Sequence, residues 1–327
     1  MIVRFDRLAV ELPPPSTPDP DGASVVQELL GGKFGEMSTF MNYTFQSFNF
    51  RSRQQARPFF DLVSNIAAEE FGHMEVVAAV INSMMTGASP VGSSPDPKDH
   101  PMAPLKSMRN AQQYIVGGHG ALPSDSMGNP WTGLNVFSSG DLIEDLTHNY
   151  FLETGARSQK LRVYETVDHP AAKALTGYLL IRGGVHQVAY ARALENLTGA
   201  NMSKLFPSPR IATDKIPECK PYIKAGEHTK LYRFSPTDYN ELAAVWNGNH
   251  PETGDPLVVI DTPPEGFVPV DLPAQPAGWA PDYAPEEIAE IAKKLRVAAG
   301  LGDEPTGDVI TPPQGKLGKL AAKVPTP

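Results

Sequence analysis

Apolar residues recur at helical spacing over four long stretches of the chain. These stretches run from about residue 21 to residue 50, from 54 to 86, from 139 to 167 and from 170 to 197. Gly87 and Gly199 follow two of them, where a helix end favours glycine, and Pro170 suits a first helical turn. The pattern predicts an all-α core, organised as a four-helix bundle over residues 21–199.

The segments around the bundle have a different pattern. Residues 88–135 are rich in proline, glycine and serine, with one short helical candidate at 105–116, which indicates a long crossover connection. Residues 1–20 have an apolar and charged stretch that ends in three prolines, which is typical of a short N-terminal strand or arm. The proline-rich region 200–327 contains a strand candidate at 257–260 and a helix candidate at 286–299, and we expect it to extend over neighbouring subunits.

The composition of the chain limits its possible binding partners and the cellular compartment in which it is expected. The formal net charge of −9 argues against binding to a nucleic acid, because a phosphate backbone needs a basic surface. Cys219 is the only cysteine, which excludes an intrachain disulfide and is typical of a reducing compartment. The start of the sequence lacks the pattern of a signal peptide, and its apolar runs are too short to cross a membrane. We therefore expect a soluble, cytoplasmic protein with neither membrane nor nucleic-acid partners.

Each predicted helix carries an acid or a histidine within its apolar stripe, where ionisable groups are rare unless they are paired or metal-bound. Glu70 and His73, three residues apart, share one face of the second helix. Glu36, Glu153 and His186 occupy comparable positions on the other three helices. Three carboxylates and two imidazoles suit two manganese or iron ions better than zinc or copper. Ferritin-like dimetal bundles follow this logic, so the sequence predicts such a site.

Glycine is frequent beside these five residues. Gly183 stands three residues before His186, where the full ligand set of a dimetal bundle would have a further carboxylate. One coordination position is then left to water or substrate, as a peroxide-processing centre requires. Each glycine costs about 1 kcal/mol in a helix interior relative to alanine. Such residues indicate close helix approach or space for solvent, and the others are Gly35, Gly72, Gly155 and Gly184.

Four segments resemble the manganese catalases: LLGGKFGEMSTFMNY, NIAAEEFGHMEVVAAVIN, HNYFLETGARSQKLRVYE and GYLLIRGGVHQVAY. The similarity covers roughly the first 250 residues, through KIPECKPYI and LYRFSPTDY. It implies a ferritin-like fold and two manganese ions per subunit. It also implies a catalase activity on hydrogen peroxide and self-association as a homo-oligomer, expected to be a hexamer.

The resemblance also implies the roles of the ligands. Glu70 would bridge the two ions, with Glu36 and His73 on one ion, and Glu153 and His186 on the other. These five residues are the predicted metal ligands.

The resemblance also concerns residues that lie beside the predicted ligands. Tyr43, seven residues after Glu36, matches a tyrosine that lies beside the ligands in the family. Some members have an arginine before the last glutamate ligand and a free glutamate in the position of Gly183. Here those positions are Leu152 and Gly183, so we expect Lys160 to handle protons.

Calcium is a further expectation, because some members bind it at subunit contacts. Asp61 matches part of that pattern, whereas Asn65 and the segment 233–235 match it poorly. The sequence therefore does not decide whether the protein binds calcium.

Several ionisable residues have simpler interpretations. His148 and Asp145 lie at ligand spacing on a polar helix face, and we expect His148 to lie beside the site or at a helix cap, not to be a ligand. Glu69 points about 100° away from Glu70 and is assigned to the outer face of its helix. Histidines in irregular segments are expected at the surface, namely His100, His119, His228 and His250.

Two alternatives compete with a catalase. One is a di-iron oxidase or iron-handling ferritin-like protein, against which Gly183 argues, since such sites supply a fourth carboxylate. The other is a catalase-like structural coat protein, which keeps the ligands but functions by assembly, and which the long C-terminal region would permit.

Overall fold

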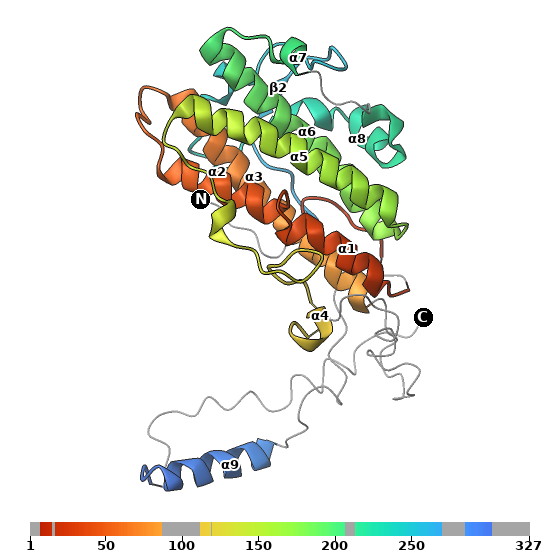
Figure 1. Ribbon diagram of the computed structural model, residues 1–327, viewed down its shortest axis with the longest axis vertical. Coiled ribbons are helices and arrows are strands. Elements are labelled where there is room, and N and C mark those ends of the chain that lie inside the picture. Colours follow the sequence, from red (N-terminus) through yellow and green to blue (C-terminus); the bar gives the residue numbers. More distant parts are fainter. Residues whose placement is uncertain are drawn as a thin grey trace. The chain divides into compact units, whose positions relative to one another are not determined.

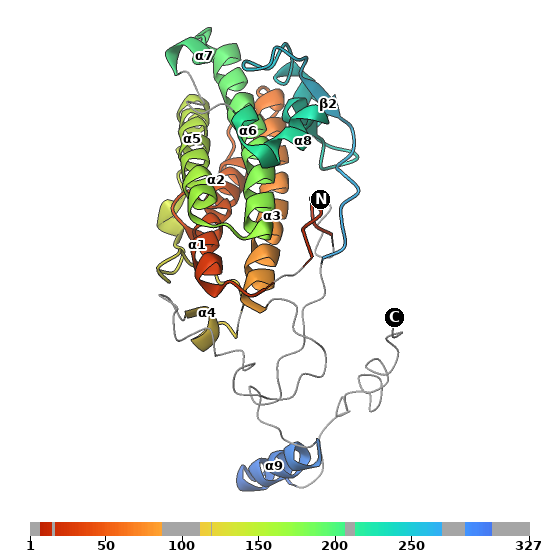
Figure 2. The same ribbon diagram turned by 90° about the vertical axis from the view of Figure 1, so that its right-hand side faces the viewer.

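A computed structural model describes residues 7–14, 17–86, 112–118, 120–206, 213–269 and 285–302. Its core is a bundle of long helices that run alongside one another, as Figures 1 and 2 show. In chain order these helices are α1 (Pro20–Gly31), α2 (Glu36–Phe48), α3 (Arg57–Thr86), α5 (Leu142–Thr166) and α6 (Pro170–Thr198). Helices α1 and α2 together take the place of one long helix, so the predicted all-α, four-helix bundle is confirmed.

The first helix of the bundle is divided in two, which the apolar pattern did not predict. Helix α1 starts after Asp19, whose side chain accepts a hydrogen bond from the Gly22 amide at 2.9 Å, and it ends at Gly31. Gly35 then caps α2, and a Cβ atom on Gly35 would lie only 2.6 Å from the carbonyl oxygen of Leu30. The close turn between the two helices therefore depends on glycine, and it makes Glu36 the first residue of α2.

The other long helices begin and end close to their predicted positions. The Asp141 side chain caps α5 by accepting from the amides of Ile143 and Glu144 at 2.9 and 3.0 Å. Helix α6 starts with a proline and ends at Gly199, which has a positive φ of 71° as predicted for a helix-ending glycine. Within the crossover, α4 (Gln112–Ile115) and the 3-10 turn η2 (Gly133–Asn135) are described, whereas Gly87 and residues 88–111 lie outside the described residues.

After α6 the chain forms a layer of short elements. Strands β1 (Lys230–Tyr232) and β2 (Val258–Ile260) pair in parallel, which confirms the predicted strand near residue 258. The short helices of this layer are α7 (Met202–Leu205), η3 (Thr213–Lys215), η4 (Pro217–Cys219), α8 (Lys220–Lys224), η5 (Glu227–Thr229) and η6 (Leu242–Ala244).

This layer contributes to the core of its own chain. Trp246 is only 1% exposed, and its indole nitrogen donates to the carbonyls of Thr229 and Val258 at 3.0 Å. The same hydrophobic cluster contains residues of the layer and of the bundle, namely Leu231, Leu242, Val245, Leu257, Leu62, Ile66 and Tyr190. Residues 231–257 of the C-terminal region therefore share a hydrophobic core with the bundle. The packing of this region on neighbouring subunits stays a prediction.

Two histidines of this layer are buried. His228 and His250 are each 7% exposed, with ring centroids 5.1 Å apart, so their predicted surface position is wrong. Burial, together with the neighbouring His228, lowers the pKa of His250 to about 4. His100 and His119 lie outside the described residues.

The two ends of the chain are described only in part. Leu8 forms an isolated antiparallel bridge with Phe267, with N–O distances of 2.7 and 2.8 Å, and residues 1–6 of the predicted strand lie outside the described residues. Residues 274–327 form a separate unit, in which α9 (Pro285–Ala298) confirms the predicted late helix. No helix among the described residues is long and apolar enough to span a membrane.

Candidate metal centre

The five predicted ligands meet in the middle of the bundle, and each is at most 1% exposed. Two oxygens of Glu70 contact the two histidines: Oε2 lies 3.0 Å from Nδ1 of His73, and Oε1 lies 2.7 Å from Nδ1 of His186. Glu36 Oε2 is 3.5 Å from the same nitrogen of His73, and Glu153 Oε1 is 3.6 Å from that of His186. The site therefore has two similar halves, arranged on either side of Glu70.

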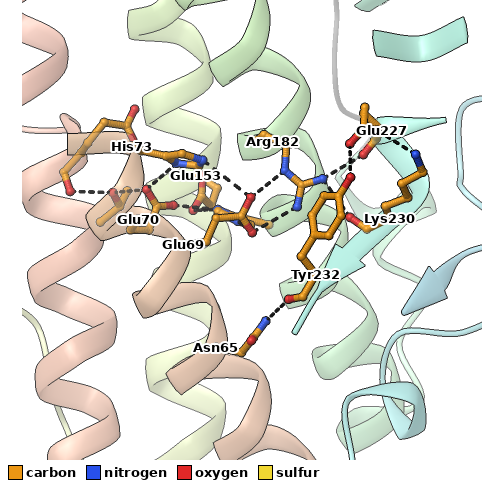
Figure 3. Close-up of polar contacts among 12 residues, drawn as sticks. Asn65, Glu69, Glu70, His73, Glu153, Arg182, Glu227, Lys230 and Tyr232 are labelled. Atoms are coloured by element: carbon orange, nitrogen blue, oxygen red, sulfur yellow. Dashed lines mark hydrogen bonds and ion pairs between the residues drawn. The ribbon is translucent and has the colours of Figure 1, made fainter. Parts of the chain in front are cut away.

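Glu69 lies on the Nε2 side of the two imidazoles, and Figure 3 shows it between His73 and Arg182. Its Oε2 is 3.1 Å from Nε2 of His186, and its Oε1 is 3.7 Å from Nε2 of His73. The two imidazole rings stack with centroids 5.5 Å apart. Glu69 is only 4% exposed, so its assignment to an outer helix face is wrong. Helix α3 packs against α6 on that side, and the face next to Glu70 is therefore interior as well.

Arg182 from α6 holds Glu69 with two hydrogen bonds. Its Nε and Nη2 donate to the two carboxylate oxygens at 2.6 and 3.1 Å, and Arg182 is 1% exposed. Burial alone would raise the pKa of Glu69, but Arg182 and His186 lower it well below the usual range. Sequence reasoning did not select Arg182. Its position four residues before His186, on the same helix face, was the available signal.

The side chain of Lys160, from α5, ends close to Gly183. Its Nζ is 2.9 Å from Glu36 Oε1 and 3.1 Å from the point that a Cβ atom on Gly183 would occupy. Glu153 Oε2 lies 3.5 Å from the same point. Burial would lower the pKa of Lys160, but Glu36, Glu153 and Glu70 raise it, so the amine is an ammonium at neutral pH.

Two hydroxyl groups contact the carboxylates. Tyr43 donates to Glu153 Oε1 at 2.6 Å, and burial together with Glu153 raises the pKa of Tyr43 well above 10. The hydroxyl of Thr39, which sequence reasoning did not select, lies 3.1 Å from Glu70 Oε2. Tyr43 therefore remains protonated and fixes the orientation of Glu153.

Comparison with known proteins identifies the family of this chain. Residues 1–301 match the family described as manganese containing catalase. The chain belongs to the manganese catalase family. This membership agrees with the ferritin-like bundle and with the residues at its centre.

Several relatives of the chain are known. An uncharacterised protein of Bacillus subtilis is 36% identical over 195 residues, which cover 59% of this chain and 69% of the relative. A manganese catalase of B. subtilis is 34% identical over 183 residues, covering 56% of this chain and 66% of the relative. A manganese catalase of Lactiplantibacillus plantarum is 29% identical, covering 56% and 67%. Among solved structures, a manganese catalase from Anabaena has 22% identity and a TM-score of 0.48, covering 80% of this chain and 100% of the other.

The residues present fit the metal ions that the family implies. Oε2 of Glu153 and Nε2 of His73 are buried without a hydrogen-bond partner among the described residues, and the closest partner of the Glu36 carboxylate among those residues is the ammonium of Lys160, 2.9 Å from Oε1. With neutral imidazoles the cluster has more carboxylates than cations, since only Lys160 and Arg182 are positive.

This excess of buried negative charge shifts the pKa values of side chains in the cluster. Burial raises the pKa of Glu36. Burial would lower the pKa of His73, but Glu70, Glu36 and Glu69 raise it to about 10. Without a bound cation, protons thus supply the missing positive charge. Hard divalent cations bound by the same oxygens and by the Nδ1 atoms would supply it instead.

Two predicted residues lie apart from the ligands. His148 stacks on Phe137 with ring centroids 4.7 Å apart. Asp61 is paired with Arg57 at 2.6 Å and accepts a hydrogen bond from the Glu241 amide at 3.1 Å. Among the interactions of the described residues, none connects His148 or Asp61 with the metal ligands.

Proposed function

We propose that this chain is a catalase that converts hydrogen peroxide into water and oxygen at a dimanganese centre. One observation carries the proposal: the carboxylates and imidazoles of four bundle helices converge on Glu70, in a chain of the manganese catalase family. Manganese ions bound there supply the redox change by which one peroxide is reduced and a second is oxidised. The alternatives of an iron-handling protein and a coat protein are not favoured by these relatives.

The proposed ligand set follows the two halves of the site. Glu70 would be shared by two ions, of which Glu36 and His73 would hold one, and Glu153 and His186 the other. The similar distances of 3.5 and 3.6 Å between each histidine Nδ1 and its own terminal carboxylate support this division. Both histidines would then hold metal through Nδ1, with Nε2 directed toward Glu69.

Lys160 is the proposed proton-transfer residue. Cleavage of peroxide to water requires protons, and the ammonium of Lys160 lies in a site from which bulk water is largely excluded. Gly183 leaves the space beside this ammonium free of a side chain, so that an oxygen of the substrate can approach Nζ. Glu36, at 2.9 Å, is the acceptor through which the proton can return.

We further propose that the protein assembles as a homohexamer in the cytoplasm, as the family resemblance and the single cysteine suggest. Exposed apolar side chains on α2 and α5 and at the end of α7 support self-association, among them Phe48, Phe151, Leu205 and Phe206. The structure gives no support to a calcium ion at Asp61, because Arg57 and the amide of Glu241 already donate to the two oxygens of that carboxylate.

Metal analysis combined with oxygen evolution tests the proposed function. Purified protein should contain about two manganese ions per chain and release oxygen from hydrogen peroxide. Glu70→Gln and His73→Ala should lose most of the metal and at least about tenfold in activity, because each removes a direct ligand. Glu165→Gln, at an exposed position of α5, is the matched control and should retain both. Full metal content and activity in Glu70→Gln would disprove the site assignment.

A further inference from the structure

Glu69 and Arg182 form a continuous polar connection between the metal centre and the C-terminal layer, as Figure 3 shows. On one side Glu69 contacts the two histidines, and on the other Arg182 Nη1 donates to the carbonyl oxygens of Glu227 and Lys230 at 2.9 and 2.8 Å. These carbonyls belong to η5 and β1, more than forty residues after Arg182 in the chain. The connection thus joins α3, α6 and the layer beyond the bundle.

We propose that Glu69 and Arg182 are positioning residues of the metal centre, through which bound metal and the segment Glu227–Tyr232 stabilise each other. The proposal rests on the dimetal site of the proposed function and adds residues to which no role has been assigned. Neither residue needs to contact substrate or metal.

The first step concerns the imidazoles. A histidine that binds a metal through Nδ1 carries its proton on Nε2, and an acceptor at Nε2 fixes both the tautomer and the ring orientation. Glu69 offers one carboxylate oxygen to each Nε2, at 3.1 Å from His186 and 3.7 Å from His73. Glu69 therefore orients His186 through a hydrogen bond, whereas at 3.7 Å from Nε2 of His73 it acts on that ring only through its charge.

The second step concerns Glu69 itself, which packing alone does not hold in place. Its far side borders a cavity of about 740 Å³, whose lining includes Phe71, Tyr178, Tyr222, Tyr232 and Pro264. A carboxylate beside so large a space can change rotamer. The bidentate hydrogen bonds from Arg182 restrict it, because the planar guanidinium fixes both carboxylate oxygens at once.

The third step concerns the segment that holds Arg182. Besides the two carbonyls, the Tyr232 ring lies 5.0 Å from the guanidinium. Glu227 accepts from Tyr232 at 2.6 Å and from Lys230 at 2.7 Å, and the carbonyl of Tyr232 accepts from Asn65 at 2.8 Å. The segment is thus a folded support for Arg182. Since stabilisation between two coupled sites is reciprocal, metal that favours this arrangement must also stabilise the segment.

Metal binding and amide hydrogen exchange together test the proposal. Manganese(II) is titrated into metal-free full-length wild-type protein and into the variants Glu69→Gln and Arg182→Lys. Both variants should bind manganese about tenfold or more weakly, because His186 loses the carboxylate that fixes its ring. Glu75→Gln, also on α3 and also at the cavity, is the matched control and should bind as the wild type does.

Hydrogen exchange supplies a readout that a general loss of stability would not produce. In the wild type, manganese should slow exchange at the amides of residues 227–232 more than in the segment 121–130. In Arg182→Lys, bound at saturating manganese, this selective protection should disappear, because lysine cannot bridge both carbonyls and Glu69. If Arg182→Lys fails to fold, Glu69→Gln serves for the same comparison.

The outcomes separate the proposal from the proposed function. Wild-type manganese affinity in Glu69→Gln, or equal protection of residues 227–232 in the variants, would overturn the inference even if the protein is an active catalase. Weakened binding with loss of selective protection would support it even if no oxygen is released, in which case only the catalase activity would be wrong.

Discussion

At the scale of single residues, Gly183, which has no side chain, says as much about the site as the proposed ligands do. The convergence of the five proposed ligands could be predicted because each interrupts an apolar helical stripe, where an unpaired charge is costly. Gly183 indicated an open position, but the sequence could not show that the ammonium of Lys160 lies beside it. Glu69 was misassigned because helical geometry separates it from Glu70 but does not reveal that α3 is covered on both of these faces.

The substitution Gly183→Glu tests the role of this space. The new Cβ would lie 3.1 Å from Lys160 Nζ, so the added carboxylate would pair with the ammonium and occupy the space reserved for substrate. We expect the variant to retain manganese and to lose most of its oxygen evolution. Gly183→Ala should lose far less, because the flexible end of Lys160 can shift by a few tenths of an ångström. Metal analysis and an oxygen electrode provide the comparison, and wild-type turnover in metal-loaded Gly183→Glu would contradict the interpretation.

At the scale of elements, local sequence predicted the helices better than the layer that covers them. Helix ends followed from signals such as Pro170 and Gly199, whose effect depends on nearby residues only. The layer around Trp246 was underestimated because its stability comes from contacts with α3 and α6, distant in sequence. The break before Glu36 was also overlooked, since an apolar periodicity continues through the turn at Gly35.

Gly35 should therefore be sensitive to a change that most helical glycines tolerate. In Gly35→Ala the new Cβ would meet the Leu30 carbonyl at 2.6 Å, so the turn must shift, at a cost of roughly 1–3 kcal/mol in unfolding free energy, and Glu36 must move with it. We expect reduced manganese content as well. Gly72→Ala is the control, because no atom lies within 4 Å of its Cβ position, and it should be neutral or stabilising by up to about 1 kcal/mol. Denaturant unfolding of the two variants, with metal analysis, checks both expectations; equal behaviour would show that the turn is not constrained by glycine.

At the scale of the whole molecule, part of the bundle surface is unusually apolar. Phe48 on α2 is 64% exposed, Phe151 on α5 is 46% exposed, and Phe206 after α7 is 44% exposed. The rings of Phe151 and Phe206 contact each other with centroids 5.3 Å apart. Large aromatic rings exposed together are typical of surfaces that another molecule covers. Because the protein is expected to form a homo-oligomer, we expect a second copy of the chain to bury these rings.

A charge placed within this aromatic pair should therefore weaken the assembly. The double variant Phe151→Asp and Phe206→Asp places two carboxylates where an interface would bury them unpaired, so we expect sedimentation analysis to show smaller species than the wild-type oligomer. The control Asn196→Asp adds a carboxylate at an exposed position near the end of α6 and should leave the size unchanged. Because the five proposed ligands come from one chain, the smaller species should still bind manganese. A wild-type protein that sediments as a monomer of 35.3 kDa would contradict self-association itself, whereas an unaltered oligomer in the double variant would assign the interface to another surface.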